Sequence, residues 1–240
     1  MKRFALIGKK LGHSYSQQYF EGLFKELGLS DHSYRLHEMA SLESLRDWIR
    51  EEGICGFNVT VPYKQAIVPL LDSLDPVAET VGAVNCVTVE GDVLTGHNTD
   101  APAFLKTLGE ERWDRALILG TGGAAQAVAY ALRKLGVAYT FVSRKPEEGM
   151  AIGYGELRSF DFSHPTLIVN ATPVGMFPDT ERSPWPCPEV LNGHCMVYDL
   201  TYNPSPTLLM RQAAAQGAKT KDGLEMLHLQ AALSWELYKR

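Results

Sequence analysis

Short strand-like runs and amphipathic stripes alternate along the first part of the chain. The runs 4–7 and 54–61 are largely apolar, and 34–37 alternates between apolar and polar residues, as β-strands do. In the stretches 16–27 and 41–49, apolar residues recur every three to four positions, which is the spacing of one helix face. This pattern predicts helices that pack against a sheet.

Three local signals refine these elements. Ser41 precedes the second helical stripe and is the expected N-cap, because its hydroxyl can accept a bond from a free backbone N–H. Pro62 follows the third strand and suits the start of a short helix. The segments 84–89 and 93–95 flank Gly91-Asp92, which predicts a β-hairpin.

The pattern changes after residue 100. The runs 116–119, 140–142, 167–169 and 196–198 are apolar throughout, which indicates strands covered on both faces, as in a parallel sheet. Segments between them supply the right-handed crossovers that parallel strands require. A last amphipathic helix follows Asp222, which can cap it. The predicted fold class is α/β.

Composition and charge narrow the function. Of the 240 residues, 45% are hydrophobic and 21% are charged, which is usual for a globular protein. The net charge is −5 without a basic block, so we expect no nucleic-acid partner and no anionic membrane surface. No apolar run approaches the roughly 20 residues of a membrane helix, and the N-terminal run is too short for a signal peptide. We therefore expect a cytoplasmic protein.

The cysteines and histidines do not indicate a metal or a disulfide framework. Cys55, Cys86, Cys187 and Cys195 form no C-x-x-C pair, which favours free thiols in a reducing compartment. The seven histidines include no H-E-x-x-H motif. We expect no metal.

A glycine-rich turn connects the run 116–119 to a helical pattern. It consists of Gly120, Thr121, Gly122, Gly123, Ala124 and Ala125. In this G-x-G-x-x-A motif, Gly120 permits a tight turn, Gly122 lets a pyrophosphate approach the backbone, and Ala125 lets the helix pack close to the sheet. The helix N-terminus also offers free N–H groups to phosphate. The turn predicts a dinucleotide site.

The end of the next strand predicts which dinucleotide binds. NAD sites place a carboxylate there, about 20 residues after the glycines, to accept the ribose hydroxyls. Here Ser143, Arg144 and Lys145 offer a hydroxyl and two cations. A guanidinium can bind a 2′-phosphate through two parallel hydrogen bonds, whereas a carboxylate would repel it. We therefore predict NADP.

The first hundred residues also carry polar side chains at the ends of apolar strands. They include Ser14, Ser16, Asn58, Thr60, Lys64, Asn85 and Asp100. Each of them alone has an ordinary explanation as a turn or cap residue. Together they supply hydroxyls, amides, one ammonium and one carboxylate, which suits a small polyhydroxylated substrate.

These blocks resemble the shikimate dehydrogenase family. N-V-T-V-P-Y-K and G-H-N-T-D are specific in combination with the terminal D-G-L-E-M-L-H-L-Q, and the blocks occur in family order over nearly the whole chain. The matching stretches are Gly8 with 11–16, 56–64, 82–87, 96–100, 120–125, 170–176, Asp199 with Tyr202 and Pro204, and 222–227 with Gln230.

The resemblance implies two α/β domains with a cleft between them. Residues 1–100, joined by a C-terminal helix at 222–240, would bind the substrate and catalyse the reaction. Residues 101–221 would form a Rossmann-like NADP-binding domain. The region 150–164 is short for the family, so we expect one crossover helix of that domain to be trimmed.

The resemblance also implies roles for individual residues. Ser14 and Ser16 would hold the substrate carboxylate, with Tyr202 nearby. Thr60, Asn85 and Gln230 would bind ring hydroxyls, and Lys64 and Asp100 match the catalytic pair, which also binds substrate. The expected cofactor-binding residues are Gly120, Thr121, Gly122, Gly123, Ala124, Ala125, Ser143, Arg144, Lys145, Asn170, Thr172, Met176 and Gly223.

The residue types at the catalytic pair agree with ketone reduction. Hydride transfer to a carbonyl builds negative charge on an oxygen that must also receive a proton. Lys64 can stabilise that charge and supply the proton. Asp100 can orient Lys64 and the reacting hydroxyl. The nicotinamide supplies the hydride, so the protein mainly holds geometry.

Three hypotheses remain open at this stage. The leading one is an NADP-dependent oxidoreductase that interconverts 3-dehydroshikimate and shikimate for aromatic amino acid biosynthesis, as a monomer or homodimer. A quinate or dual quinate/shikimate dehydrogenase is the nearest alternative, although Ser143 and Arg144 argue against NAD and Ser16 favours shikimate. A catalytically silent nucleotide-binding regulator would be expected to lack Lys64 or Asp100, and both are present.

Overall fold

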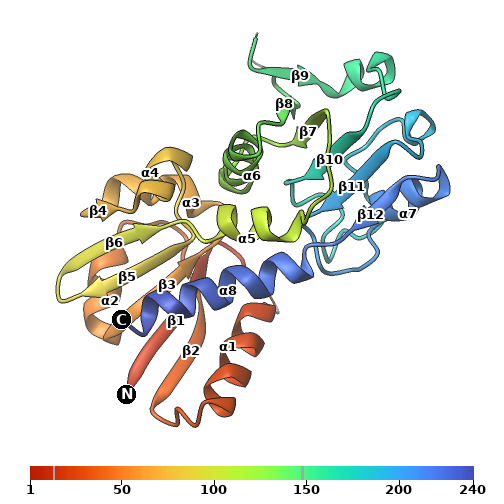
Figure 1. The fold of residues 1–240 in the computed structure, drawn as a ribbon. Coiled ribbons are helices and arrows are strands. Elements are labelled where there is room, and N and C mark those ends of the chain that lie inside the picture. Colours follow the sequence, from red (N-terminus) through yellow and green to blue (C-terminus); the bar gives the residue numbers. More distant parts are fainter. Residues whose placement is uncertain (13, 147–148) are drawn as a thin grey trace. The chain divides into compact units, whose positions relative to one another are not determined.

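The computed structural model describes residues 1–12, 14–146 and 149–240, and the chain forms two compact units. Unit 1 comprises Met1–Ala103 and Leu227–Arg240, and unit 2 comprises Phe104–Met226. Each unit is built around one six-stranded sheet with helices packed against it (Figure 1). The chain is therefore α/β throughout, as predicted.

Unit 1 has a mixed sheet in the order β2-β1-β3-β5-β6-β4. The strands are β1 (Lys2–Gly8), β2 (His32–Glu38), β3 (Ile54–Val59), β4 (Ser73–Leu74), β5 (Cys86–Glu90) and β6 (Val93–His97). The helices are α1 (Tyr15–Glu26), α2 (Leu45–Glu52), α3 (Tyr63–Ala66), the 3-10 helix η1 (Val68–Leu70) and α4 (Pro76–Val81). Helices α5 (Asp100–Thr107) and α8 (Leu224–Tyr238) each begin in one unit and end in the other.

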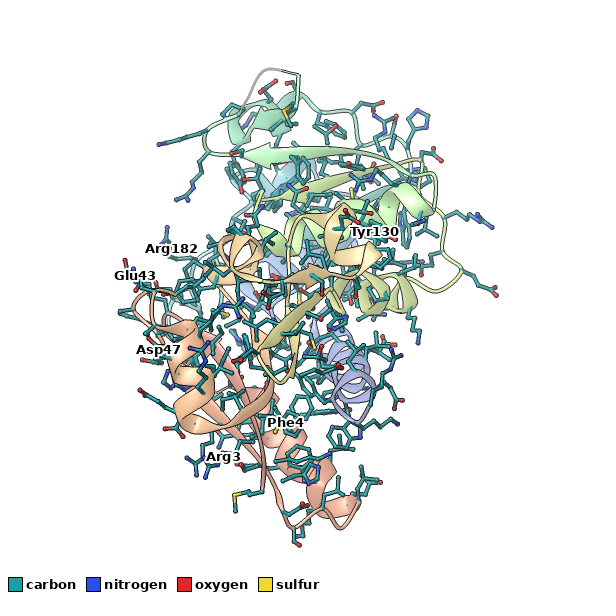
Figure 2. All side chains as sticks on the ribbon, turned by 90° about the vertical axis from the view of Figure 1, so that its left-hand side faces the viewer. Arg3, Phe4, Glu43, Asp47, Tyr130 and Arg182 are labelled. Carbon is teal, nitrogen blue, oxygen red and sulfur yellow. The ribbon has the colours of Figure 1, made fainter. Side chains whose placement is uncertain are left out.

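Side-chain alternation along β1 divides the core of unit 1 into two layers. Phe4 and Leu6 face a cluster that contains α1 and α8, whereas Ala5 and Ile7 face a cluster that contains α2, α3 and α4. Phe4, which Figure 2 labels, stacks on Tyr238 of α8 with ring centroids 4.8 Å apart. Because both faces of the sheet are covered, its central strands carry mostly apolar side chains on both sides.

The local predictions for unit 1 hold with one correction. β5 and β6 pair antiparallel around Gly91-Asp92, which confirms the hairpin. Ser41 does not cap α2, because that helix starts later in the chain, at Leu45, with Ser44 as its N-cap residue. Ser44 makes no side-chain cap bond, so packing of the apolar face, including Trp48, holds the helix instead.

Unit 2 has a wholly parallel sheet in the order β12-β11-β10-β7-β8-β9. The strands are β7 (Arg115–Leu119), β8 (Ala138–Ser143), β9 (Ala151–Gly153), β10 (Thr166–Asn170), β11 (Cys195–Asp199) and β12 (Lys219–Lys221). The helices are α6 (Gly123–Lys134), the 3-10 helices η2 (Tyr154–Ser159) and η3 (Pro188–Val190), and α7 (Leu208–Ala215). The four continuous apolar runs are the four central strands, β11, β10, β7 and β8, which confirms the parallel sheet.

The strand order of unit 2 reverses between β7 and β10. From β7 the chain proceeds outward through β8 to β9, and then returns to place β10 on the other side of β7. In open parallel sheets, ligands bind at the carboxyl ends of the strands at such a reversal. A cofactor site is therefore expected at the loops after β7 and β10.

The connection from β9 to β10 is short. In the described part of the chain, the 3-10 helix η2 is the only helix in this crossover. That it replaces a longer helix of the family stays a prediction. Across residues 1–12, 14–146 and 149–240, no helix has both the length and the apolar composition needed to cross a membrane.

Candidate active site

Lys64 and Asp100 form an ion pair inside unit 1. Lys64 Nζ donates to Asp100 Oδ2 at 2.7 Å, and the two side chains are 17% and 7% exposed. An ammonium and a carboxylate so far removed from water attract each other strongly, and each would be costly to bury alone. The two predicted catalytic residues are therefore in direct contact as a shielded ion pair.

Each residue of the pair lies in the first turn of a helix that follows a strand. Lys64 is the second residue of α3, and its carbonyl accepts a bond from Val84 N–H at 2.7 Å, which ties α3 to the segment before β5. Asp100 begins α5, where free N–H groups and the helix dipole favour a negative charge. Asn98 Oδ1 accepts from Ala101 N–H at 3.0 Å and caps the same turn.

Asn85 connects this pair to α8. Its Nδ2 donates to Asp100 Oδ1 at 3.0 Å and lies 3.3 Å from Gln230 Oε1. Its Oδ1 accepts from Thr99 N–H at 2.7 Å. The structure thus brings together Lys64, Asp100, Asn85 and Gln230, four of the predicted substrate-site residues, although they come from four separate segments of the chain.

The other predicted substrate residues of unit 1 lie at helix and strand ends. Ser14 is the N-cap of α1 and accepts from Ser16 N–H at 3.2 Å, and Ser16 is buried. Thr60 follows β3, and its N–H donates to Ile7 O at 2.9 Å. A Cβ at Gly8 would come within 2.7 Å of the Thr60 methyl carbon, so glycine lets the two strand ends approach. Their contact with substrate stays a prediction.

In unit 2, the glycine-rich turn has the shape that a pyrophosphate needs. Gly120 has φ +98°, which other residues rarely adopt, and its N–H donates to Val142 O at 2.9 Å. A Cβ at Gly122 would meet no atom within 4 Å, so the space beside this backbone is open. Gly123 then begins α6, whose first N–H groups have no partner within the helix. The observed turn therefore fits a phosphate group.

The loop after β10 lies beside this turn. A Cβ at Gly120 would come within 3.0 Å of the Thr172 methyl carbon, and Ala171 N–H donates to Leu119 O at 3.1 Å. Asn170 accepts from the N–H and hydroxyl of Thr172 at 3.0 and 2.7 Å. Asn170 is fully buried, so it shapes the loop from within, whereas Thr172 is only half-buried.

A buried carboxylate, Asp199, anchors that loop. It accepts from Asn170 Nδ2 at 2.9 Å, from Thr201 N–H at 3.0 Å and from Thr207 Oγ1 at 2.8 Å. Burial raises the pKa of Asp199, and these hydrogen bonds oppose the rise by favouring the charged form. Asp199 thus holds the ends of β10 and β11 together.

The predicted 2′-phosphate residues form a tight turn after β8. Ser143 Oγ donates to Lys145 O and accepts from Lys145 N–H, both at 3.1 Å. Arg144 and Lys145 are exposed. Arg144 lies close enough to Tyr154 for its charge to lower the phenol pKa, although burial raises that pKa by more. Two exposed cations therefore follow the strand next to the glycine turn.

Three further predicted residues lie elsewhere in unit 2. Met176 is 44% exposed and is available to a ligand, and Tyr202 is half-buried. Gly223 is buried, and a Cβ there would overlap the carbonyl oxygen of Leu200, so the two backbones touch directly. The roles of these three residues stay predictions.

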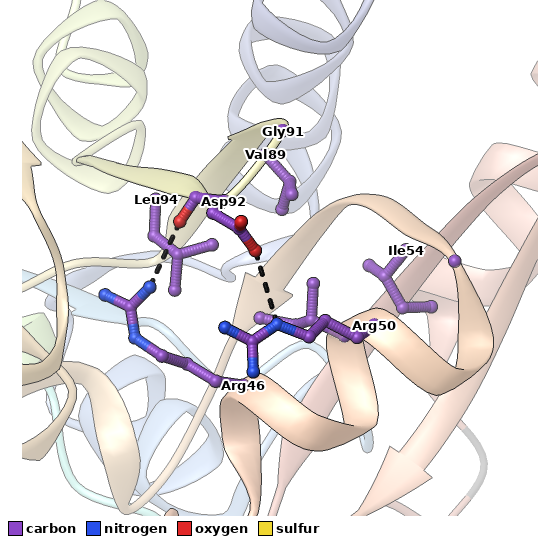
Figure 3. A pocket seen from close by; sticks show the side chains of 9 residues that line it. Arg46, Arg50, Ile54, Val89, Gly91, Asp92 and Leu94 are labelled. Atoms are coloured by element: carbon purple, nitrogen blue, oxygen red, sulfur yellow. Dashed lines mark hydrogen bonds and ion pairs between the residues drawn. The ribbon is translucent and has the colours of Figure 1, made fainter.

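A small pocket of unit 1 lies outside this site. It has a volume of about 180 Å³ and lies between α2 and the β5–β6 hairpin. Arg46 donates to Asp92 O at 3.1 Å, and Arg50 Nε donates to the Asp92 carboxylate at 3.2 Å (Figure 3). Its charges are already paired with one another, so it offers little to a charged ligand.

A polar layer lies behind the catalytic pair, and sequence analysis placed Asn58 among the polar substrate-site candidates but assigned no role to Thr99 or Ser234. Asn58, Thr99 and Ser234 are buried and hydrogen-bonded to one another or to Asn85. Ser234 follows Gln230 by four residues on α8, so the two share a helix face. That spacing was the one sequence signal that could have indicated Ser234.

Comparisons with known proteins identify the family of this chain. The family described as shikimate dehydrogenase substrate binding domain matches residues 6–87. The NADP(+) shikimate dehydrogenase of Bacillus licheniformis is 37% identical over 257 residues, which cover 98% of this chain and 90% of the relative.

Solved structures match over the same length. Shikimate dehydrogenase 1 of Peptoclostridium difficile has a TM-score of 0.90 at 35% identity and covers 100% of this chain and 92% of its own. Shikimate 5-dehydrogenase of Thermus thermophilus, in complex with NADP(H) and shikimate, has a TM-score of 0.86 at 36% identity, with coverages of 99% and 93%. The chain therefore belongs to the shikimate dehydrogenase family.

Proposed function

We propose that the protein is an NADP-dependent shikimate dehydrogenase that reversibly reduces 3-dehydroshikimate to shikimate. The observation that carries this proposal is the buried Lys64–Asp100 ion pair, with Asn85 on the free oxygen of the carboxylate. This arrangement offers a proton and a positive charge next to hydrogen-bonding groups for a polyol. The full-length relatives with this name support the reaction class.

In this proposal, unit 1 binds the substrate. Ser14 and Ser16 hold its carboxylate through hydroxyls at the start of α1, and Tyr202 is a further substrate-binding residue of the proposal. Thr60, Asn85 and Gln230 bind the ring hydroxyls. The amide of Asn85 is well suited to this, because its orientation is set by the Thr99 N–H.

Lys64 and Asp100 carry the proton chemistry of the proposal. In reduction, the ammonium of Lys64 stabilises the negative charge that develops on the carbonyl oxygen and transfers a proton to it. Asp100 orients the Lys64 side chain through the 2.7 Å bond. In the reverse direction, the pair accepts the proton of the substrate hydroxyl. Partial exclusion of water strengthens each of these interactions.

Unit 2 binds NADP in this proposal, and NADP supplies or accepts the hydride when bound. The turn Gly120–Ala125 holds the pyrophosphate at the N-terminus of α6. Ser143, Arg144 and Lys145 hold the 2′-phosphate. Thr172, Met176 and Gly223 line the nicotinamide end, while Asn170 shapes its loop from within.

A four-way turnover assay tests the function. Shikimate and quinate are each mixed with the protein and either NADP or NAD, and the absorbance of the reduced nicotinamide is followed. We expect the largest kcat/KM for shikimate with NADP. Preference for quinate with NAD would support the alternative dehydrogenase, and no reduction in any mixture over a broad pH range would support a silent regulator.

The proposal extends to the setting of the enzyme. A net charge of −5 without a basic block argues against binding to an anionic membrane surface, which supports a cytoplasmic enzyme. The proposed reaction is one of aromatic amino acid biosynthesis, as the names of the relatives imply. We propose a monomer or a homodimer, which sedimentation at micromolar concentration distinguishes.

A further inference from the structure

A chain of buried hydrogen bonds runs from the core of unit 1 to the catalytic carboxylate. It starts at Asn58 on β3, passes through Ser234 on α8 and Thr99 before α5, and reaches Asp100 through Asn85. All five residues are buried, with at most 5% of each exposed. Buried polar groups in such a network must be satisfied, so their arrangement is constrained.

The orientation of the Asn58 amide is fixed by its neighbours. Its Nδ2 lies 3.1 Å from Asn85 O, which can only accept, so the nitrogen must be on that side. Its Oδ1 then accepts from Tyr34 and Tyr238 hydroxyls at 2.9 and 3.0 Å. The second proton on Nδ2 points to Ser234 Oγ at 2.9 Å. Asn58 can therefore only donate to Ser234.

The two hydroxyls in the middle of the chain have one consistent arrangement. Ser234 donates its only proton to Gln230 O at 2.9 Å, so its oxygen accepts from Asn58 and from Thr99 Oγ1 at 3.3 Å. Thr99 therefore donates its hydroxyl proton to Ser234, and the Thr99 oxygen accepts from Asn85 Nδ2 at 2.8 Å. Every bond in the chain thus has a defined donor and acceptor.

The last hydrogen bond of this chain runs from Asn85 to the carboxylate of the catalytic pair. One proton of Asn85 Nδ2 is taken by Thr99, and the other lies between Asp100 Oδ1 at 3.0 Å and the more distant Gln230 Oε1 at 3.3 Å. The other carboxylate oxygen, Oδ2, holds Lys64 at 2.7 Å. The rotation of the carboxylate about its χ2 angle is therefore held from both oxygens.

We propose that Ser234 and Asn58 are positioning residues for the Lys64–Asp100 pair, acting through Thr99 and Asn85. The inference rests on the proposed function in one respect, namely that this pair performs the proton transfer. Small errors in the placement of a catalytic group lower turnover, because proton transfer requires the donor and acceptor to be close and aligned.

Ser234→Ala and Tyr34→Phe form a matched pair of variants. Each removes one buried hydroxyl from the same network. Ser234→Ala deletes the acceptor of Thr99, whereas Tyr34→Phe leaves Asn58 Oδ1 with its bond from Tyr238. We expect Ser234→Ala to lower kcat with shikimate about 5- to 10-fold, the effect of one net hydrogen bond, with the KM for NADP changed less than twofold. Tyr34→Phe should lower the thermal stability about as much as Ser234→Ala does, but should keep kcat within twofold of the wild-type value.

A spectroscopic readout separates this inference from the proposed function. The side-chain amide signal of Asn85 in a ¹⁵N-labelled sample should shift and exchange faster with water in Ser234→Ala, and stay unchanged in Tyr34→Phe. If wild-type protein shows no shikimate turnover, the proposed function fails, while this signal still decides the positioning role.

Ser234→Cys, which keeps a weak donor of similar shape, should give an intermediate kcat and provides the test if Ser234→Ala folds poorly. Equal kcat losses in Ser234→Ala and Tyr34→Phe, or an unmoved Asn85 signal, would overturn the inference.

Discussion

Lys64 Nζ lies 2.7 Å from Asp100 Oδ2, although 36 positions separate the two residues. The side chains are mostly shielded from water, and Asn85 donates to the second oxygen of the carboxylate. A surface pair of this kind would contribute little, whereas a shielded pair depends on both partners remaining in place.

We expect Lys64→Ala to lower turnover of shikimate about 10²- to 10⁴-fold, because it removes the proton-transferring group. NADP affinity, measured by calorimetric titration, should remain within a few fold, since the glycine turn lies in unit 2. Lys25→Ala, which removes an exposed lysine of α1, is the control and should retain normal turnover. Near-normal activity in Lys64→Ala would show that the catalytic assignment is wrong.

Arg144→Ala should raise the KM for NADP about 10- to 100-fold and the KM for NAD much less, because one charge-assisted contact to the 2′-phosphate is lost. Steady-state kinetics with both cofactors measures this difference. Arg158→Ala is the control, since it removes another exposed arginine of unit 2 that pairs with Glu189 at the surface. An equal rise in both KM values would contradict the role of Arg144.

Gly223→Ala should destabilise the protein by about 1–3 kcal/mol, because the added Cβ would overlap the Leu200 carbonyl oxygen. Thermal unfolding of the variant should show a clear fall in Tm. Gly155→Ala is the matched control, because a Cβ at Gly155 meets no atom within 4 Å. If both variants melt alike, the close contact between residues 200 and 223 is not a feature of the folded protein.

The titration of Asp199 should make part of the stability depend on pH. Burial raises its pKa in the folded state above the unfolded value of about 3.9, so between these two values the folded state binds more protons than the unfolded state. The contribution of Asp199 to stability is thus present below the unfolded pKa and is lost as pH rises through the folded pKa.

Asp199→Asn provides the measurement for this effect. The free energy of unfolding of wild type minus that of Asp199→Asn, followed by urea titration from about pH 3 to about pH 7, should fall as pH rises. Loss of the bond from Thr207 shifts this difference by a constant and leaves its slope unchanged. A difference that rises with pH would mean that the hydrogen bonds outweigh burial at this carboxylate.

Much of the fold follows from local patterns along the chain. The apolar runs at 116–119 and 196–198 became β7 and β11 because strands covered on both faces cannot tolerate alternating polar residues. The start of α2 was misplaced, since Ser41 suits a cap by type but the helix begins at Leu45 after Ser44. Ser44 makes no side-chain cap bond, so capping chemistry, the only local signal used, did not mark this boundary.

The sequence by itself determined the residue types of the site and the glycine turn, because Gly120 at φ +98° and the helix after it are local features. Only the tertiary structure decided that Asn85 donates to both Asp100 and Thr99, and that Thr99 in turn contacts Ser234. These contacts join a loop, the start of α5 and the helix α8. Hydrogen bonds act over about 3 Å between groups far apart in sequence, and no spacing pattern along the chain records which distant groups meet.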